Sequence, residues 1–153
     1  MEEIELFGDA YFMREALREA AKALDKEEVP IGCVIVLNNR IIARGHNLTE
    51  TLNDVTAHAE MQCITAAENY LGAKYLNDCI IYITLEPCLM CAGALRWAQV
   101  GRIVFGAPDL KYGFGKFIEN IVHPKTVVTG GVMEQECGKL ITDFFKKKRK
   151  NNF

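Results

Sequence analysis

The chain has 153 residues, of which 50% are hydrophobic and 25% are charged. This length is typical of one domain, and the composition excludes a disordered chain, a collagen-like repeat and a mucin-like stalk. Five consecutive basic residues, 146–150, follow a body with 13 basic and 20 acidic residues, a net charge of −7. We therefore expect a single domain over residues 1–153, with a basic helix end that can meet an anionic partner.

The first half of the chain predicts a helix, a hairpin and a second helix. Apolar residues recur at three- and four-residue steps from Asp9, which can cap a helix, to about residue 25. Pro30 interrupts this pattern. The two strands of a hairpin are expected over residues 31–37 and 40–46. A polar loop follows the hairpin, and a second helix is expected over about residues 57–71.

The second half alternates strands with helices. Pro87 fits the first turn of a helix that runs to about residue 99, because helices tolerate proline there. Residues 107–125 are expected to be irregular. Three further strands are expected, over residues 79–85, 102–106 and 126–129.

The last helix is the most regular pattern in the chain. Apolar residues from Met133 to Phe145 recur with helical spacing, so at least one of Phe144 and Phe145 should be buried. Taken together, the order of elements predicts an α/β fold in which helices pack on both faces of one sheet.

The six cysteines point to metal or redox chemistry. The acidic N-terminus lacks the basic and apolar regions of a signal peptide, and no apolar run approaches the ~20 residues that span a bilayer. We therefore expect a cytoplasmic protein with no membrane contact, in a compartment where thiols stay reduced. There, a C-x-x-C pair more often binds a metal or exchanges electrons than forms a structural disulfide.

Two short segments at predicted helix starts carry the chemistry: 56–60 (TAHAE) and 85–91 (LEPCLMC). Cys88 and Cys91 are three residues apart in a first helical turn, so their sulfurs lie on one side, where the helix dipole favours thiolates. With His58 they provide three ligands for Zn²⁺. The fourth tetrahedral position is then free for water, as in catalytic zinc sites.

Glu60 is the candidate proton carrier beside such a zinc ion. Attack of water on an aromatic ring carbon needs a group that accepts and delivers protons, and Glu60 is two residues from a ligand. In a regular helix, however, positions i and i+2 point about 200° apart. His58 and Glu60 can therefore share a site only if His58 lies outside the regular helix.

H-x-E followed by P-C-x-x-C is the signature of the zinc nucleobase deaminases. More narrowly, the chain resembles the bacterial tRNA adenosine deaminases, the TadA family, from Tyr11 to Phe145. The supporting stretches are 11–14 (YFMR), 28–32 (EVPIG), 45–47 (GHN), 56–60 (TAHAE), 82–93 (YITLEPCLMCAG), 101–107 (GRIVFGA) and 143–145 (DFF).

This resemblance implies a fold and a reaction. The implied fold is the cytidine deaminase-like three-layer α/β/α arrangement with a central, mixed, five-stranded sheet. The implied reaction is zinc-dependent hydrolytic deamination of adenosine to inosine at the wobble position of tRNA anticodons. One Zn²⁺ per subunit would be held by His58, Cys88 and Cys91, and Glu60 would shuttle protons.

The resemblance also implies how RNA is bound. Asn47 would hydrogen-bond the flipped base and Val29 would pack on it. Asp109 and Lys111 match the loop that meets the RNA, and Phe145 with the basic residues after it matches the helix that cradles the anticodon loop. The family is homodimeric. One departure is the segment 112–115 (YGFG), which is bulkier than the small residues common in that loop.

Other interpretations of the same residues stay open. Cys88 and Cys91 alone would also fit a redox pair, although that function leaves His58 and Glu60 unused. A free nucleobase or nucleoside, such as guanine, cytosine or cytidine, is an alternative substrate, and a zinc-stabilised RNA-binding module is an alternative to an enzyme. The basic run can also be a solvated helix end, and Glu86 is assigned no chemistry.

Overall fold

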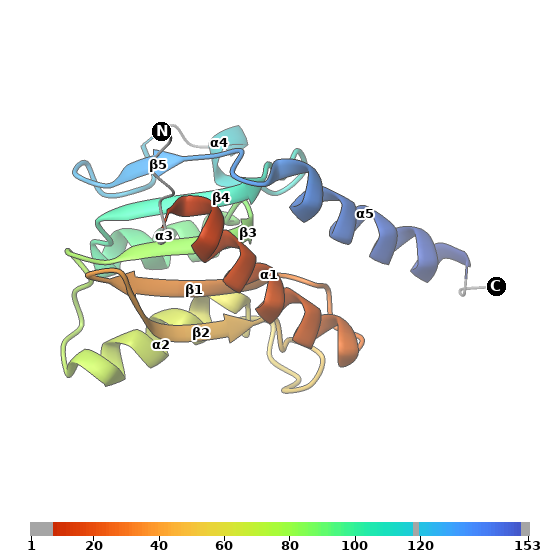
Figure 1. Ribbon diagram of the computed structural model, residues 1–153, viewed down its shortest axis with the longest axis horizontal. Helices are drawn as coiled ribbons and strands as arrows, with labels where there is room; N and C mark the ends of the chain where they lie inside the picture. The colour runs from red at the N-terminus through yellow and green to blue at the C-terminus, as the bar shows by residue number, and fades with distance from the viewer. Residues whose placement is uncertain (1–7, 118–119, 151–153) are drawn as a thin grey trace, which may run out of the picture.

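A computed structural model describes residues 8–117 and 120–150 (Figure 1). The N-terminal residues that bear on a signal peptide lie outside this part of the chain. None of the described helices is both long and apolar enough to cross a membrane. The strands are β1 (Gly32–Leu37), β2 (Arg40–His46), β3 (Ile80–Leu85), β4 (Arg102–Ala107) and β5 (Val127–Thr129). The helices are α1 (Asp9–Asp25), α2 (Ala59–Leu71), α3 (Leu89–Ala98), α4 (Phe114–Phe117) and α5 (Glu134–Lys150).

The five strands form one mixed sheet in the order β2-β1-β3-β4-β5. The short turn between β1 and β2 makes that pair antiparallel, and β1 is also antiparallel to β3. By contrast, β3, β4 and β5 are parallel, because a helix or a long crossover lies between consecutive members. The expected mixed five-stranded sheet is confirmed.

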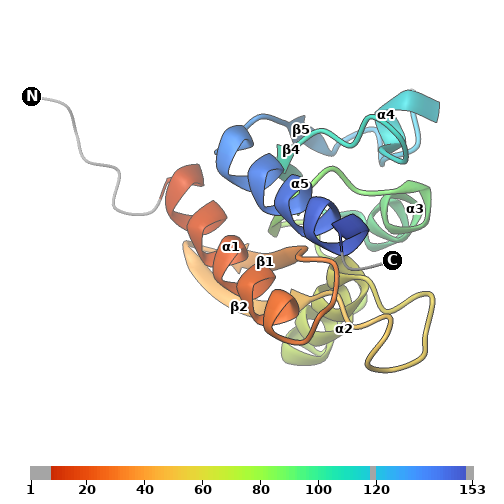
Figure 2. The ribbon, with the colours of Figure 1, turned by 90° about the vertical axis from the view of Figure 1, so that its right-hand side faces the viewer.

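Helices cover both faces of this sheet. Alternate residues of β1 point to opposite faces, so Val34 packs in a cluster with α1, whereas Cys33 and Ile35 pack in a cluster with α2. Figures 1 and 2 show α1 and α5 on one side of the sheet and α2 and α3 on the other. The three-layer α/β/α prediction is therefore confirmed.

Helix α2 packs tightly against the sheet where it begins. A Cβ atom on Gly45 in β2 would lie 2.8 Å from the carbonyl oxygen of Ala59. Only glycine allows the backbone of the first turn of α2 to approach the strand this closely. The close approach lies at the start of the helix, which comes two residues later than the sequence pattern indicates.

The capping role expected of Asp9 is wrong. The N-cap of α1 is Gly8, and the Asp9 carboxylate accepts hydrogen bonds from both terminal nitrogens of Arg102 at 2.8 Å and from the Tyr82 hydroxyl at 2.8 Å. The Arg102 guanidinium lowers the pKa of Asp9. A charged partner in a distant strand thus binds this carboxylate more strongly than the local backbone does.

The burial expected of Phe144 or Phe145 is also wrong. Neither is buried, and Cys137 is the one buried residue of α5. The helix packs on β4 and β3 near its start and then runs outward past the sheet (Figure 1). Its apolar stripe is real, but no other element of the described chain covers its far half. The segment expected to be irregular also contains α4, a single helical turn.

Candidate metal centre and active site

His58 lies where the chain enters α2 rather than within the helix. It is the N-cap residue and has extended backbone angles, φ −69° and ψ 156°. The requirement that allows His58 and Glu60 to face one site is therefore met. The bend results from local turns before the helix, in which the Thr56 N–H donates to Asp54 Oδ1 at 2.8 Å and the Ala57 N–H donates to the Asp54 carbonyl oxygen at 3.1 Å.

Cys88 and Cys91 come from the first turn of α3. Cys88 is the N-cap, with φ −73° and ψ 175°, and Cys91 is the third residue of the helix. Pro87 therefore lies before the N-cap and not inside the first turn as the sequence pattern predicts. The carbonyl oxygen of Pro87 accepts a hydrogen bond from the Phe114 N–H at 2.9 Å, which ties the start of α3 to the loop after β4.

The three predicted ligands converge on a point. His58 Nδ1 is 3.6 Å from Cys88 Sγ and 3.5 Å from Cys91 Sγ, and all three donor atoms lie within 4.8 Å of one another. Tetrahedral zinc with bonds of about 2.3 Å to sulfur and 2.05 Å to nitrogen would place such donors about 3.6 Å apart. The donor set and its spacing therefore fit zinc, with Nδ1 as the histidine ligand.

Of the three ligands, only Cys88 is shifted towards the charge state that zinc needs. Hydrogen bonds from the Cys91 thiol and from the His58 ring lower the pKa of Cys88 to about 4, despite partial burial. The hydrogen bond to Cys88 raises the pKa of His58, as does a hydrogen bond to the backbone of Val55. The bond donated to Cys88 raises the pKa of Cys91. Cys88 is thus shifted towards the thiolate, the form that coordinates metals, and zinc would displace a proton from Cys91 on binding.

Glu60 lies in a dry position beside the ligands. Its residue is 4% exposed, and burial raises the pKa of its carboxyl group, as does the negative charge of Cys88. A raised pKa makes a carboxylate a better acceptor of a proton from water. It lies in the first turn of α2, whose N-terminal dipole favours its charged form.

Asn47 and Val29, the predicted base-binding pair, lie together. Asn47 follows β2 and is 5% exposed, and its side-chain nitrogen donates to the Val29 carbonyl oxygen at 3.4 Å. Its side-chain oxygen accepts the Thr49 N–H at 3.3 Å. Their contact with a base stays a prediction.

Asp109 and Lys111 lie in the loop between β4 and α4. The Asp109 side chain accepts hydrogen bonds from the N–H groups of Lys111 and Tyr112 at 3.0 Å, so it shapes the turn. The loop reaches the metal ligands through Gly113, which forms an isolated β-bridge with Cys88. The structure thus brings this loop beside the cluster, while the Lys111 side chain is exposed.

Phe145 is not among the residues gathered at the cluster. It is 42% exposed on α5 and its ring contacts that of Phe144 edge-on, with centroids 5.2 Å apart. Helix α5 packs mainly on β4 and β3. A role for Phe145 therefore depends on what covers the far half of the helix.

Two glutamates near the site are not identified by sequence patterns. Glu28 and Glu86 each accept backbone N–H groups from a loop beside the metal ligands. Such contacts join positions more than 20 residues apart, which periodicity cannot detect. The one signal in the sequence is an acidic residue beside a strongly apolar segment, since a buried carboxylate must find donors elsewhere.

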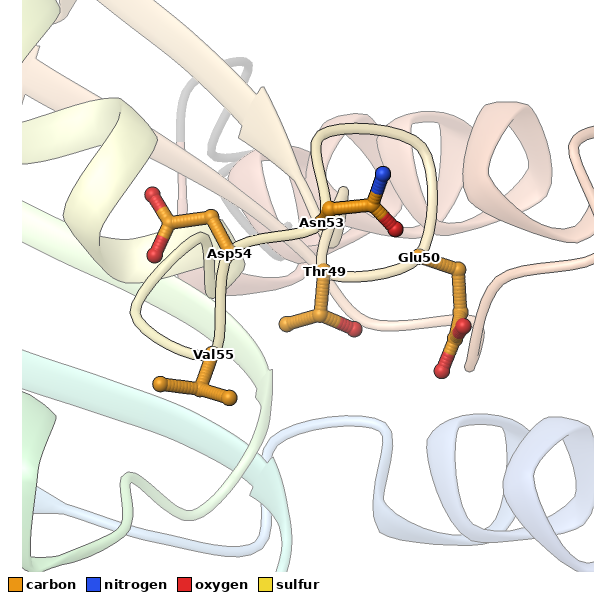
Figure 3. A pocket seen from close by; sticks show the side chains of 5 residues that line it. All are labelled: Thr49, Glu50, Asn53, Asp54 and Val55. Carbon is orange, nitrogen blue, oxygen red and sulfur yellow. The ribbon is translucent and has the colours of Figure 1, made fainter.

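A hollow opens on the loop that leads from Asn47 to His58. Figure 3 shows the side chains of Thr49, Glu50 and Val55 projecting from one side of this loop. The hollow is open to solvent, and its lining residues are Thr49, Glu50, Asn53, Asp54 and Val55.

Comparison with known proteins places these features in a family. Residues 8–107 match the family model of the cytidine and deoxycytidylate deaminase zinc-binding region. A tRNA-specific adenosine deaminase of Bacillus subtilis is 46% identical over 147 residues, which cover 93% of this chain and 91% of that protein. One from Aquifex aeolicus is 43% identical over 94% of this chain and 98% of its own length.

Comparison with solved structures points to the same family. A structure from studies of A-to-I editing by tRNA:A34 deaminases at the wobble position of transfer RNA has a TM-score of 0.79 and 43% identity, and covers 85% of this chain and 98% of that one. The chain belongs to the cytidine and deoxycytidylate deaminase family, and within it to the branch whose members are named tRNA-specific adenosine deaminases.

Proposed function

We propose that this protein hydrolytically deaminates adenosine to inosine at the wobble position of tRNA anticodons. The observation that carries the proposal is the cluster of His58, Cys88 and Cys91 with buried Glu60 beside it. The cluster supplies three ligands and leaves a fourth position open, as hydrolysis requires. The substrate is inferred from relatives named for tRNA adenosine and 43–46% identical over nearly the whole chain.

The three ligands and Glu60 have different roles in the reaction. Zinc bound by the three ligands would lower the pKa of a coordinated water from about 15.7 towards 7. Glu60 accepts a proton from the attacking water and delivers it to the ring nitrogen next to C6. A new C–O bond forms at C6, and Glu60 then carries the second proton to the departing amine. The C–N bond breaks, ammonia leaves and the C6 carbonyl of inosine remains.

Asn47 and Val29 would hold the adenine base. The Asn47 amide offers donor and acceptor atoms for the edge of the base, and the Val29 side chain offers an apolar surface for its ring. Their direct hydrogen bond supports this arrangement, because it fixes both residues before the base arrives. An RNA loop can supply such a base, since its bases are unpaired or can be turned out of the stack at a small cost in free energy.

The RNA around that base would meet two parts of the surface. Lys111 lies in a loop shaped by Asp109 beside the cluster, and the run 146–150 ends α5 with consecutive exposed basic side chains. Such side chains suit phosphate groups. We further propose that Phe145, exposed on the same helix, packs against the anticodon loop.

We also propose a homodimer located in the cytoplasm. Large apolar side chains are exposed on the outer face of α3, among them Trp97 at 82% exposure, and an exposed apolar surface favours a protein partner. All six cysteines are free thiols, as in a reducing compartment. Light scattering of the purified protein at several concentrations tests the dimer.

The experiment that tests the reaction uses zinc-loaded protein and an anticodon stem-loop that carries adenosine at the wobble position. Inosine should appear at that position and at no other. The competing substrate class is a free base, and a guanine deaminase structure from Bacillus subtilis, 41% identical and covering 64% of this chain, keeps it in the test. Ammonia release from guanine, cytosine or cytidine, without inosine in several stem-loops, would favour that class.

A further inference from the structure

Glu28 is a buried carboxylate with an unusual set of partners. It has 0% exposure and lies directly before Val29. Within residues 8–117 and 120–150 it takes part in none of the ion pairs, and its two oxygens instead accept hydrogen bonds from a loop more than 20 residues away. Oε1 accepts the Glu50 N–H at 2.9 Å, and Oε2 accepts the Thr51 N–H and hydroxyl, both at 3.2 Å.

These three bonds hold the middle of the loop that joins the base-binding residue to the metal ligand. At one end, the Asn47 N–H donates to the Ile31 carbonyl oxygen at 3.1 Å. Near the other end, the Leu48 N–H donates to the Ala57 carbonyl oxygen at 3.0 Å, next to His58. Figure 3 shows the loop turning back on itself between these ends. Glu28 therefore attaches the loop to the segment that presents Val29.

A carboxylate is suited to this position and an amide is not. Three donors converge on Glu28, and an ionised carboxylate offers only acceptor sites. Glutamine would keep one oxygen but would point an NH₂ group at one or more of these donors. Bonds to an ionised acceptor are also stronger than neutral ones, and the fully buried carboxyl group of Glu28 has lost water as a partner.

We propose that Glu28 is a positioning residue for the deamination reaction, holding the 47–55 loop so that Asn47 and Val29 keep the geometry that receives the base. This inference rests on the proposed function. Glu28 does not touch the substrate; it acts through the loop and through Asn47, and a displacement of about 1 Å at a site of this kind can lower the rate by up to 100-fold.

The test compares Glu28→Gln with Glu27→Gln, which makes the same chemical change in the neighbouring, exposed side chain. We expect Glu28→Gln to lower kcat/KM on the wobble-adenosine stem-loop at least tenfold while zinc stays at one per chain. Amide exchange at residues 50 and 51 should accelerate at least tenfold. Glu27→Gln should stay within twofold of the unmodified protein in both measurements.

A second comparison separates positioning from simple loss of stability. In an Asn47→Ala background, Glu28→Gln should lower kcat/KM less than threefold, because the residue through which it acts is gone. The same tenfold loss in both backgrounds would overturn the proposal, as would near-normal kcat/KM with faster amide exchange. Unchanged amide exchange would show that the carboxylate does not hold the loop.

A milder variant keeps the proposal testable if Glu28→Gln fails to fold. Thr51→Val removes only the hydroxyl donor from an exposed residue, and kcat/KM should fall two- to fivefold; no change would contradict the proposal. If the unmodified protein makes no inosine, the proposed function fails. The amide-exchange comparison then still decides whether Glu28 holds the loop.

Discussion

The metal cluster and the far end of α5 both have a part in the proposed function, but they are built in opposite ways. At the cluster, His58 and Cys88 are N-cap residues of packed helices, and neighbouring loops are bonded to buried or half-buried carboxylates. The far half of α5 has exposed basic side chains and no buried residue. Chemistry at a base requires fixed atoms, whereas attraction of phosphates requires only charge within reach.

Among changes at the metal cluster, removing a metal ligand should produce the largest effect. Cys88→Ala should abolish zinc binding and inosine formation, and should lower Tm by on the order of 10 °C because metal binding stabilises the folded chain. A chelator should lower Tm of the unmodified protein and leave that of the variant unchanged. Metal analysis and thermal unfolding measure these effects.

Cys137→Ala is the matched control, since it removes a buried thiol on the opposite face of the sheet. It should lose some stability from the cavity but keep one zinc per chain. An active Cys88→Ala preparation that contains no transition metal would contradict the assignment of the metal site.

Changing the proton carrier should give the next largest effect. Glu60→Gln keeps the size of the side chain but cannot accept the proton of water, so turnover should fall by about 10²–10⁴-fold. Zinc content and RNA affinity should stay near normal. Loss of turnover with binding retained would exclude an RNA-binding module without catalysis. Glu68→Gln, farther along α2, is the control. Inosine formation by Glu60→Gln within tenfold of the unmodified rate would refute its role.

The sequence predicts the cluster well because its determinants are local. The two spacings, H-x-E and C-x-x-C, place donors at helix starts, and the need for an extended His58 follows from helix geometry alone. Most elements are also predicted within two residues, because the apolar periods of helices and strands differ.

The rest depends on contacts that a one-dimensional pattern does not contain. Periodicity shows that α5 has an apolar stripe but not what covers it, so the expected burial of Phe144 or Phe145 is wrong. Asp9 finds Arg102 from a distant strand instead of capping its own helix. Glu28 and Glu86 acquire their hydrogen-bond partners only when loops fold back on them, as the tertiary structure decides.

Changing Glu86 tests whether the loop between β4 and α4, beside the metal cluster, must also be held in place. Its oxygens accept the N–H groups of Asp109 at 3.1 Å and Gly115 at 3.0 Å. Glu86→Gln should loosen residues 109–115, accelerate their amide exchange and raise KM for the stem-loop by about tenfold, while zinc content is unchanged. Glu136→Gln, an exposed carboxylate on α5, is the matched control. A normal KM with faster exchange would show that the loop tolerates displacement.

Replacing the basic run 146–150 of α5 should have the smallest effect, and that effect should appear in the salt dependence of RNA binding. Replacing the basic residues of 146–150 with glutamine should weaken stem-loop binding about fivefold at moderate salt. The slope of log affinity against log salt should also fall by about 0.7–0.9 for each phosphate that is no longer neutralised, because fewer counterions are released. KM should change more than kcat, since the run would contact phosphates of the RNA and not the reacting base.

Lys74→Gln, which removes an exposed charge beyond the C-terminal end of α2, should leave the salt slope unchanged. If the affinity of the unmodified protein for the stem-loop is the same at low and moderate salt, the basic run is only a solvated helix end. A loss in kcat of about tenfold upon replacement of the basic run would instead mean that α5 orders the active site. The contrast between a rigid metal cluster and a helix end that only attracts phosphates would then be wrong.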